Sequence, residues 1–364
     1  MLRASKVENS RLSALSKEAM LYDREADDAV TCNLCAHRCY VPAGREGVCK
    51  VRVNHAGVLR TLVYDRVIAA HIDPMEKKPL FHFLPGSSVF SIATVGCNFH
   101  CRYCQNWDIS QLPRLHEGAV PGEKLTPREI VNYALEAGCR SIAYTYTEPT
   151  VFFELAYDTA ILAAEASLRN IFVTNGYMTP EALRTIHPYL HAVNIDLKGF
   201  DDKRHRRMSG AKLQPVLDSI ALAKQLGIWM EVTTLVVPGH NDSDEELRQI
   251  ALFLSYIDPN IPWHLSAFFP AYKMMEVEPT DRESLLRAWR IGKDNGLHHV
   301  YCGNLPALRE DTICQRCGKT LVRRVGFTVQ SNQLDQGRCP FCHAAVPGVW
   351  NRESLSSGSR AEIH

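Results

Sequence analysis

The sequence has no apolar run that approaches the roughly 18 residues of a membrane-spanning helix. Its first stretch, MLRASKVENSRLSALSKEAMLYD, is polar and lacks the apolar core of an export signal. Neither sign of charge is in excess, since the net charge is +1 over 364 residues. This balance gives no general attraction to nucleic acid or to acidic membranes. We therefore expect a cytoplasmic protein whose partners are recognised at local sites.

Cysteine, by contrast, is plentiful, with 13 residues. A reducing compartment keeps thiols free for metals or catalysis, so we do not expect disulfides. Two cysteines, Cys139 and Cys302, stand alone and are interpreted as buried small hydrophobic residues. The others form three groups: Cys32, Cys35, Cys39 and Cys49; Cys97, Cys101 and Cys104; and Cys314, Cys317, Cys339 and Cys342.

Short apolar stretches alternate with amphipathic ones between the second and third cysteine groups. The predicted strands are residues 88–95, 140–146, 170–175, 191–198, 228–237 and 263–269, with 297–302 as a further strand. The intervening helices begin at capping residues, and three capping boxes are predicted: Thr126 with Glu129, Ser243 with Glu246, and Thr280 with Glu283. Consecutive strand–helix rounds predict parallel strands joined by right-handed crossovers.

These rounds fit either a barrel or a doubly wound sheet. No G-x-G-x-x-G follows the first strand, which weakens the doubly wound alternative. Polar residues gather after the strands, where barrel enzymes carry their chemistry: the three cysteines, Glu148, Asn175, Asp196 with Lys198, and His240 with Asn241. We therefore predict an α/β fold with a partial (β/α)6 barrel.

The predicted barrel spans residues 86–302 and is flanked by different material. An N-terminal four-cysteine region covers residues 1–85, and a zinc-ribbon-like module covers 303–350. The polar tail, 351–364, is predicted to be disordered.

Three closely spaced cysteines lie in VGCNFHCRYCQN, residues 95–106. Thiolates favour zinc, copper(I) and iron–sulfur clusters. A [4Fe–4S] cluster has four irons, normally each held by one cysteine, so three cysteines would leave one iron open for a small molecule. The alternative is a zinc site that takes its fourth ligand from His100 or Cys139.

The spacing C-x3-C-x-aromatic-C, with Tyr103 as the aromatic, resembles the signature of the radical S-adenosylmethionine (SAM) superfamily. The resemblance implies a partial barrel in which the open iron binds SAM and the reduced cluster cleaves it. The products would be methionine and a 5′-deoxyadenosyl radical that abstracts hydrogen from a substrate. The cofactors would carry this chemistry, so no catalytic side chain is assigned. An electron donor such as flavodoxin or ferredoxin is also implied.

Further motifs resemble the activating-enzyme branch, typified by pyruvate formate-lyase activating enzyme. YTEP, residues 146–149, stands where that branch has G-G-E-P, which would give Thr147 and Glu148 contacts to the SAM amino group. Here Tyr146 and Thr147 replace two glycines that allow close backbone approach. The same resemblance implies SAM contacts from four more residues: Asn175, Asp196, Lys198 and His264.

Side-chain chemistry agrees with part of this assignment. An Asp suits ribose hydroxyls, and a Lys suits a carboxylate. Two alternatives remain: Asp196 and Lys198 could form a surface ion pair, and His264 could be a core histidine.

The C-terminal cysteines form two C-x2-C pairs separated by 21 residues, close to the zinc-ribbon pattern. We expect structural zinc there, with partner or nucleic-acid binding as the alternative. The N-terminal cysteines could hold zinc or an auxiliary [4Fe–4S] cluster, with His37 as an alternative ligand. Structural zinc is favoured, because nothing in the sequence identifies an electron-transfer role.

Motifs along nearly the whole chain resemble the AmmeMemoRadiSam-system radical SAM enzyme family: CNLCAHRC…GREGVC, DPMEKKPLFHFLPGS, VGCNFHCRYCQN and a zinc ribbon ending in GVW. Memo-type and AMMECR-type proteins are therefore expected partners. DPMEKKPL could be a binding loop or a solvated turn at Lys77 and Lys78. The leading hypothesis is a SAM-cleaving radical enzyme; glycyl-radical enzyme activation and a non-catalytic zinc and iron–sulfur module are the alternatives.

Overall fold

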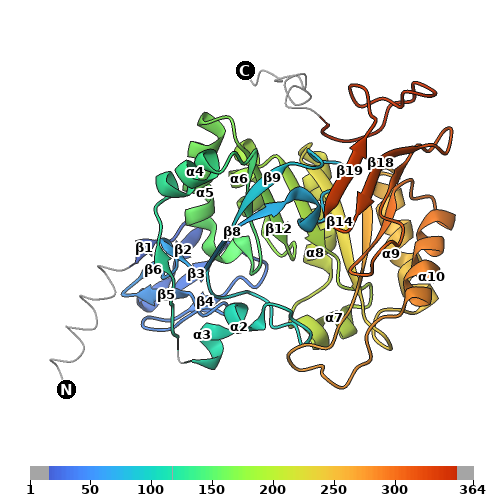
Figure 1. Cartoon of the computed structure of the whole chain (residues 1–364). Helices are drawn as coiled ribbons and strands as arrows, with labels where there is room; N and C mark the ends of the chain where they lie inside the picture. The colour runs from blue at the N-terminus through green and yellow to red at the C-terminus, as the bar shows by residue number, and fades with distance from the viewer. Residues whose placement is uncertain (1–15, 117, 351–364) are drawn as a thin grey trace.

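The computed structural model describes residues 16–116 and 118–350, and the predicted disordered tail lies outside them. An eight-stranded sheet, in the order β16-β15-β14-β13-β12-β11-β9-β8, forms its centre (Figure 1). All neighbours pair in parallel except β8 (Ala69–Pro74), which is antiparallel to β9. The parallel strands are β9 (Ser88–Ala93), β11 (Ser141–Tyr144), β12 (Arg169–Thr174), β13 (Ala192–Asp196), β14 (Trp229–Val236), β15 (Trp263–Ala267) and β16 (Val300–Gly303).

Helices follow the strands as predicted, which confirms the α/β partial barrel. They are α4 (Pro127–Glu136), α5 (Phe153–Glu165), α6 (Pro180–Ile186), α8 (Gln214–Gln225), α9 (Asp244–Ile257) and α10 (Arg282–Asp294). A short 3-10 helix, η3 (Pro149–Phe152), precedes α5. Helix α7 (Asp202–Ser209) was not predicted, because DKRHRRMS has almost no apolar residue to mark a buried face. No described helix is long and apolar enough to span a bilayer.

The helix caps were predicted with mixed success. Thr126 caps α4 in a complete capping box. Ser243 caps α9, but the predicted box is wrong because the Glu246 carboxylate instead accepts from the Phe200 backbone N–H at 2.8 Å. For α10, Asp281 is the cap instead of Thr280, whose hydroxyl is used in a tertiary hydrogen bond to the Val236 carbonyl.

The segment after β8 closes the amino-terminal end of the barrel. Its apolar side chains pack with residues of four parallel strands and with Val349 in one buried cluster: Met75, Leu80, Phe83, Leu84, Val89, Ala143, Ile171, Ala192 and Val349. This end is therefore filled with side chains. The loops at the carboxyl ends of the strands are left to form the site.

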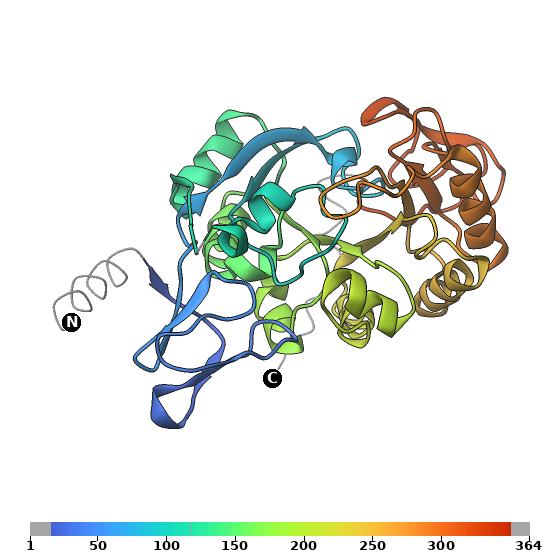
Figure 2. The same cartoon turned by 90° about the horizontal axis from the view of Figure 1, so that it is seen from below.

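Smaller sheets flank the barrel on opposite sides (Figures 1 and 2). The N-terminal strands are β1 (Lys17–Glu18), β2 (Tyr22–Arg24), β3 (Val30–Cys32), β4 (Tyr40–Val41), β5 (Arg52–His55), β6 (Val58–Thr61) and β7 (Arg66–Val67), the last paired with β10 (Glu123–Lys124). The C-terminal sheet contains β17 (Thr312–Ile313), β18 (Thr320–Val325) and β19 (Thr328–Asn332). Two short helices, α2 (Trp107–Ser110) and α3 (Leu112–Leu115), follow the three-cysteine loop.

Candidate functional site

The three-cysteine loop leaves the carboxyl end of β9 and docks on α7. The backbone N–H groups of His100 and Arg102 donate to carbonyls of Ser209 and Met208 at 2.9 and 3.0 Å. The loop enters through Gly96, whose φ of +96° and whose close approach to Val51 leave no room for a side chain. The unpredicted helix therefore supports the loop that the sequence singled out.

Cys101 is buried, and Cys97 and Cys104 are partly buried. The Phe99 backbone N–H donates to Cys97 Sγ at 3.3 Å, and the Ser110 hydroxyl lies 3.3 Å from Cys104 Sγ. Burial raises the pKa of all three thiols, that of Cys101 to about 12. A bound cation would supply the positive charge that three buried thiolates require, so this donor set fits a metal cluster.

Neither proposed fourth zinc ligand is well placed. Cys139 is buried just before β11, at the opposite end of the parallel strands from the loop. The imidazole of His100 packs against Gly210, so closely that a Cβ at residue 210 would lie 1.8 Å from the ring. Three cysteines without a fourth protein ligand are the donor set of a cubane with one open iron. Cys302 is also buried, as expected of an isolated apolar cysteine.

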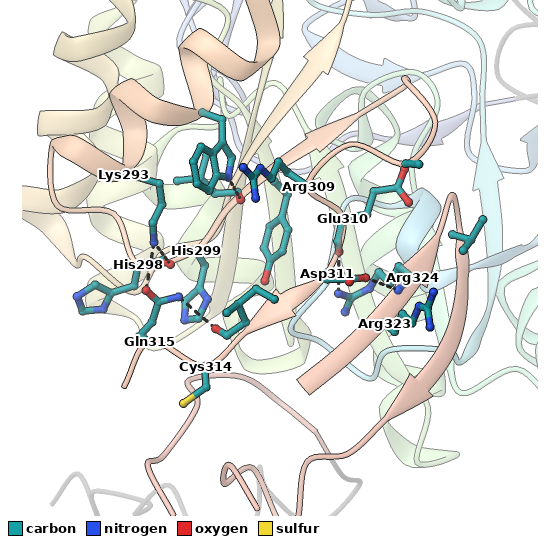
Figure 3. A pocket seen from close by; sticks show the side chains of 16 residues that line it. Lys293, His298, His299, Arg309, Glu310, Asp311, Cys314, Gln315, Arg323 and Arg324 are labelled. Atoms are coloured by element: carbon teal, nitrogen blue, oxygen red, sulfur yellow. Dashed lines mark hydrogen bonds between the residues drawn. The ribbon is translucent and has the colours of Figure 1, made fainter. Parts of the chain in front are cut away.

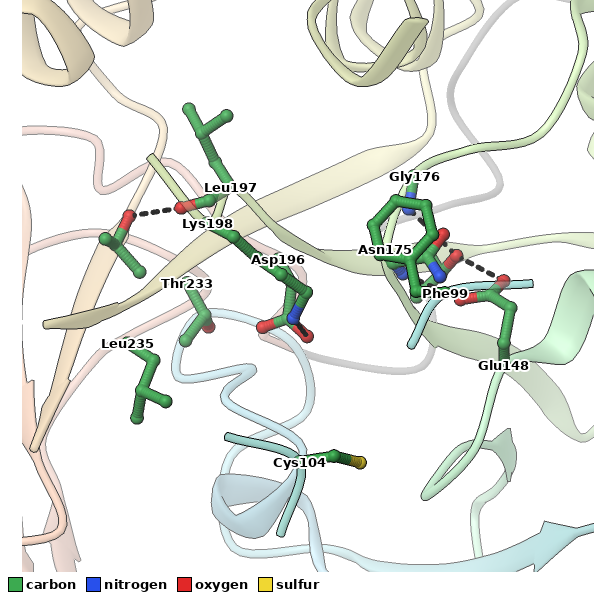
Figure 4. Close-up of polar contacts among 12 residues, drawn as sticks. Phe99, Cys104, Glu148, Asn175, Gly176, Asp196, Leu197, Lys198, Thr233 and Leu235 are labelled. Atoms are coloured by element: carbon green, nitrogen blue, oxygen red, sulfur yellow. Dashed lines mark hydrogen bonds and ion pairs between the residues drawn. The ribbon is translucent and has the colours of Figure 1, made fainter. Parts of the chain in front are cut away.

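Glu148 lies at the carboxyl end of β11 and is 1% exposed (Figure 4). Its Oε1 accepts from the Thr150 N–H at 3.0 Å and the Thr174 hydroxyl at 2.7 Å, while Oε2 accepts from the Asn175 N–H at 2.8 Å. Burial raises the pKa of this carboxyl, although these hydrogen bonds favour the charged form. Glu148 therefore fixes the ends of two neighbouring strands.

Tyr146 has a φ of +61°, in the left-handed region that glycine adopts most readily. Its hydroxyl donates to Asp73, and Lys78 Nζ lies 4.4 Å from its ring centroid. The neighbouring Thr147 hydroxyl donates to the Thr94 carbonyl at 2.9 Å. The altered YTEP motif is thus held in place by side chains that two glycines would lack.

Asn175 connects the end of β12 with the cysteine loop. Its Nδ2 donates to Asn98 Oδ1 at 2.7 Å and lies 3.9 Å from Cys97 Sγ. Nothing in the sequence apart from its place beside Cys97 marks Asn98 as part of the site.

Asp196 and Lys198 form an ion pair of 2.9 Å beside the cysteine loop (Figure 4). The Lys198 side chain is only 13% exposed, so the pair is not a solvated surface contact. Burial opposes the charge of Lys198, but Asp196, Cys101 and Tyr103 together raise its pKa well above the ordinary value. Tyr103 is itself buried, and the desolvation of its phenol raises its pKa as well.

His264 is buried and matches the core-histidine alternative. Its Nε2 lies 2.6 Å from Glu231 Oε2. Glu231 also accepts from the backbone N–H groups of Phe81 and His82, at 2.9 and 2.8 Å. The histidine therefore belongs to the hydrogen bonds that hold the barrel's closing segment.

The two lysines of DPMEKKPL have different environments. Lys77 is 45% exposed, as a solvated turn would have it, whereas Lys78 is 1% exposed and contacts Asp73 at 2.6 Å. Burial lowers the pKa of Lys78 to about 8, against the attraction of Asp73. The sequence alone could not distinguish two adjacent lysines.

A large cavity of about 610 Å³ has no residue of the three-cysteine loop in its lining, which is shown in Figure 3. It is bounded by α10, β16 and the C-terminal module, and its basic lining includes Lys293, Arg309 and Arg324. Cavity volume alone therefore does not identify the site in this fold.

The two four-cysteine groups have different geometries. The C-terminal sulfurs all lie within 4.8 Å of one another, which fits a four-coordinate metal ion. Among the described residues, the N-terminal cysteines form no such compact group, although all four line one cavity. His37 Nε2 is 2.8 Å from the Asn98 carbonyl oxygen, so that nitrogen is already used within the protein.

Comparison with known proteins gives several similarities. Residues 91–254 match the model of the radical SAM superfamily. An uncharacterized protein of Methanocaldococcus jannaschii is 42% identical over 330 residues, which are 90% of this chain and 97% of that protein.

Activating enzymes are similar over shorter spans. A second M. jannaschii protein, provisionally named a glycyl-radical enzyme activating enzyme, is 27% identical over 213 residues, covering 56% of this chain and 77% of that protein. An isethionate sulfite-lyase activating enzyme of Nitratidesulfovibrio vulgaris is 32% identical over 105 residues, or 28% of this chain and 34% of that enzyme.

Proposed function

Because this chain belongs to the radical SAM superfamily and is a radical SAM enzyme, we propose that Cys97, Cys101 and Cys104 hold its [4Fe–4S] cluster. When bound, the cluster and SAM would supply a 5′-deoxyadenosyl radical, which abstracts hydrogen from a substrate of unknown identity. The observation that carries the proposal is one loop with three thiols whose pKa burial raises, while neither described candidate, His100 or Cys139, is placed to act as a fourth ligand. The protein's own task is to bind, orient and shield these groups.

Asp196 and Lys198 are proposed to orient SAM. The Asp196 side chain is 35% exposed and can accept from ribose hydroxyls, while the Lys198 ammonium can donate to a carboxylate. Their ion pair holds the two side chains together, and Asp196, Cys101 and Tyr103 raise the pKa of Lys198 against the effect of burial. His264 has no role in this proposal, because its imidazole is bound to Glu231.

Glu148 and Thr147 are proposed to lie near the SAM amino group. Glu148 Oε2 accepts one protein hydrogen bond, from the Asn175 N–H, and a carboxylate oxygen can accept a second. The contact between Asn175 and Asn98 would then keep this group aligned with the cysteine loop.

We further propose zinc at the C-terminal cysteines, whose compact spacing suits it. Memo-type and AMMECR-type proteins are proposed partners, and flavodoxin or ferredoxin is the proposed electron donor. The AmmeMemoRadiSam assignment is supported by the motifs along the chain.

The test is anaerobic reconstitution with iron and sulfide, followed by dithionite and SAM. We expect 5′-deoxyadenosine to accumulate with the intact chain and not with Cys101→Ala. Cys302→Ala, a buried cysteine outside the three groups, is the matched control and should retain activity. Product formation by Cys101→Ala, or its absence from the intact chain with cluster and SAM bound, would contradict the proposal.

Glycyl-radical enzyme activation is a second candidate, favoured by the similarity to activating enzymes. Incubation with a candidate glycyl-radical enzyme should then produce a glycyl-radical signal in electron paramagnetic resonance (EPR). SAM cleavage without any such signal would leave the broader proposal in place and reject this one.

A further inference from the structure

The four N-terminal cysteines line a cavity that lies next to the three-cysteine loop. Their four side chains line it together with residues of the barrel, among them Asn98, Thr150 and Val151. Asn98 directly follows Cys97, and Thr150 hydrogen-bonds to Glu148. The cavity therefore lies at the joint between the N-terminal region and the three-cysteine loop.

The two four-cysteine sites differ in the distances between their sulfur atoms. Four thiolates at about 2.3 Å from one zinc lie about 3.8 Å from each other in a tetrahedron. The C-terminal set meets this condition, with contacts of 3.6 Å between Cys314 and Cys342 and between Cys317 and Cys339. The described N-terminal sulfurs do not gather as closely. A cubane needs wider spacing, because four irons and four sulfides lie between its cysteines.

Two buried donors without partners provide an independent observation. Asn98 Nδ2 and Arg52 Nε have no hydrogen-bond acceptor among the described residues, although their side chains line this cavity. Asn98 is 1% exposed and Arg52 is 2% exposed. A buried donor left unpaired costs roughly 1–3 kcal/mol, so such atoms point to an acceptor that binds there.

We propose that Cys32, Cys35, Cys39 and Cys49 hold an auxiliary [4Fe–4S] cluster, to which Asn98 and Arg52 donate hydrogen bonds. A cluster held by four thiolates is anionic, and its sulfurs accept hydrogen bonds from nearby N–H groups. The guanidinium of Arg52 adds a positive charge, and its ion pair with Glu154 holds it in position. This assignment replaces the structural zinc favoured by the sequence.

The test measures metals in a chain that lacks the first cluster. After anaerobic reconstitution, the Cys97→Ala/Cys101→Ala/Cys104→Ala variant should retain about four irons and four sulfides and about one zinc. Adding Cys32→Ala and Cys35→Ala should remove the iron and leave the zinc. A triple variant that binds no iron, or that binds a second zinc, would overturn the proposal.

EPR of the reduced protein provides a second test, which begins with the intact chain. Its reduced EPR spectrum should contain two cluster signals, of which SAM changes only one. Asn98→Leu should shift the reduction potential of the SAM-insensitive signal to a more negative value, because a donor to the cluster is lost. A single signal, fully changed by SAM, would refute the auxiliary cluster even if SAM cleavage proceeds normally.

Discussion

Replacing Gly176 with alanine should destabilise the protein in a way that the structure makes specific. Gly176 follows Asn175 with a φ of +69°, a conformation that costs a non-glycine residue roughly 1–2 kcal/mol. A Cβ at this position would also lie 2.7 Å from Ile195 Cγ2 and 3.3 Å from Val216 Cγ1, and both side chains are buried. Such overpacking costs a further 1–3 kcal/mol or so, giving a total of roughly 2–5 kcal/mol.

Gly227→Ala is the matched control for this prediction. Gly227 has a φ of +73°, but no atom lies within 4 Å of its added Cβ. It should lose only the conformational term of roughly 1–2 kcal/mol. In the Gly176→Ala/Ile195→Ala double variant, the loss should be smaller than the sum of the single losses, because the clash is relieved.

Anaerobic urea titration of the free energy of unfolding is the assay. The reasoning also predicts that Gly176→Ala retains less iron after desalting than Gly227→Ala, since a shift of Asn175 disturbs its contact with the cysteine loop. Equal destabilisation by the two alanines would refute the argument from packing.

Glu231→Ala should lower the free energy of unfolding by about 3 kcal/mol or more, because Phe81 and His82 would lose the acceptor of their buried N–H groups; a loss below 1 kcal/mol or so in urea titration would contradict this. Lys78 has a pKa lowered to about 8, so above pH 8 the folded chain binds fewer protons than the unfolded chain. The stability of the native protein relative to Lys78→Met should therefore rise between pH 8 and 10, and a fall would reverse the sign of the argument. Cys339→Ala should lose the metal proposed for the C-terminal cysteines without losing iron, as measured by metal analysis. A parallel loss of iron would contradict the independence of the two sites.

The regular part of the fold could be predicted because each round carries its own local signals. Thr126 and Glu129 cap α4 with contacts made entirely inside the helix, so sequence reasoning found them. The prediction of Thr280 as the cap of α10 was wrong, because Asp281 is an equally good cap and the Thr280 hydroxyl makes a tertiary hydrogen bond. The polar helix α7 was not predicted, because hydrogen bonds to the cysteine loop stabilise it and not an apolar face.

The candidate site was predictable only where spacing itself carries the chemistry. The three cysteines could be predicted as a site, since three ligands leave one iron of a [4Fe–4S] cluster open. Asn98 and Lys78 could not, because an amide or an ammonium acquires meaning only from its neighbours in space. The contact between His264 and Glu231 likewise joins strands β15 and β14, and no local sequence pattern predicts it.

The docking of the cysteine loop on α7 also has a thermodynamic consequence. Helix α7 follows β13, the strand that ends with Asp196, and its carbonyls hold the backbone of the loop that contains Cys101. Binding that stabilises helix α7 should therefore also stabilise the cysteine loop, and the reverse. If Asp196 and Lys198 bind SAM, cofactor and cluster become linked ligands, and linkage is reciprocal. SAM should then strengthen the binding of the cluster to the chain by the same free energy with which the assembled cluster tightens the binding of SAM.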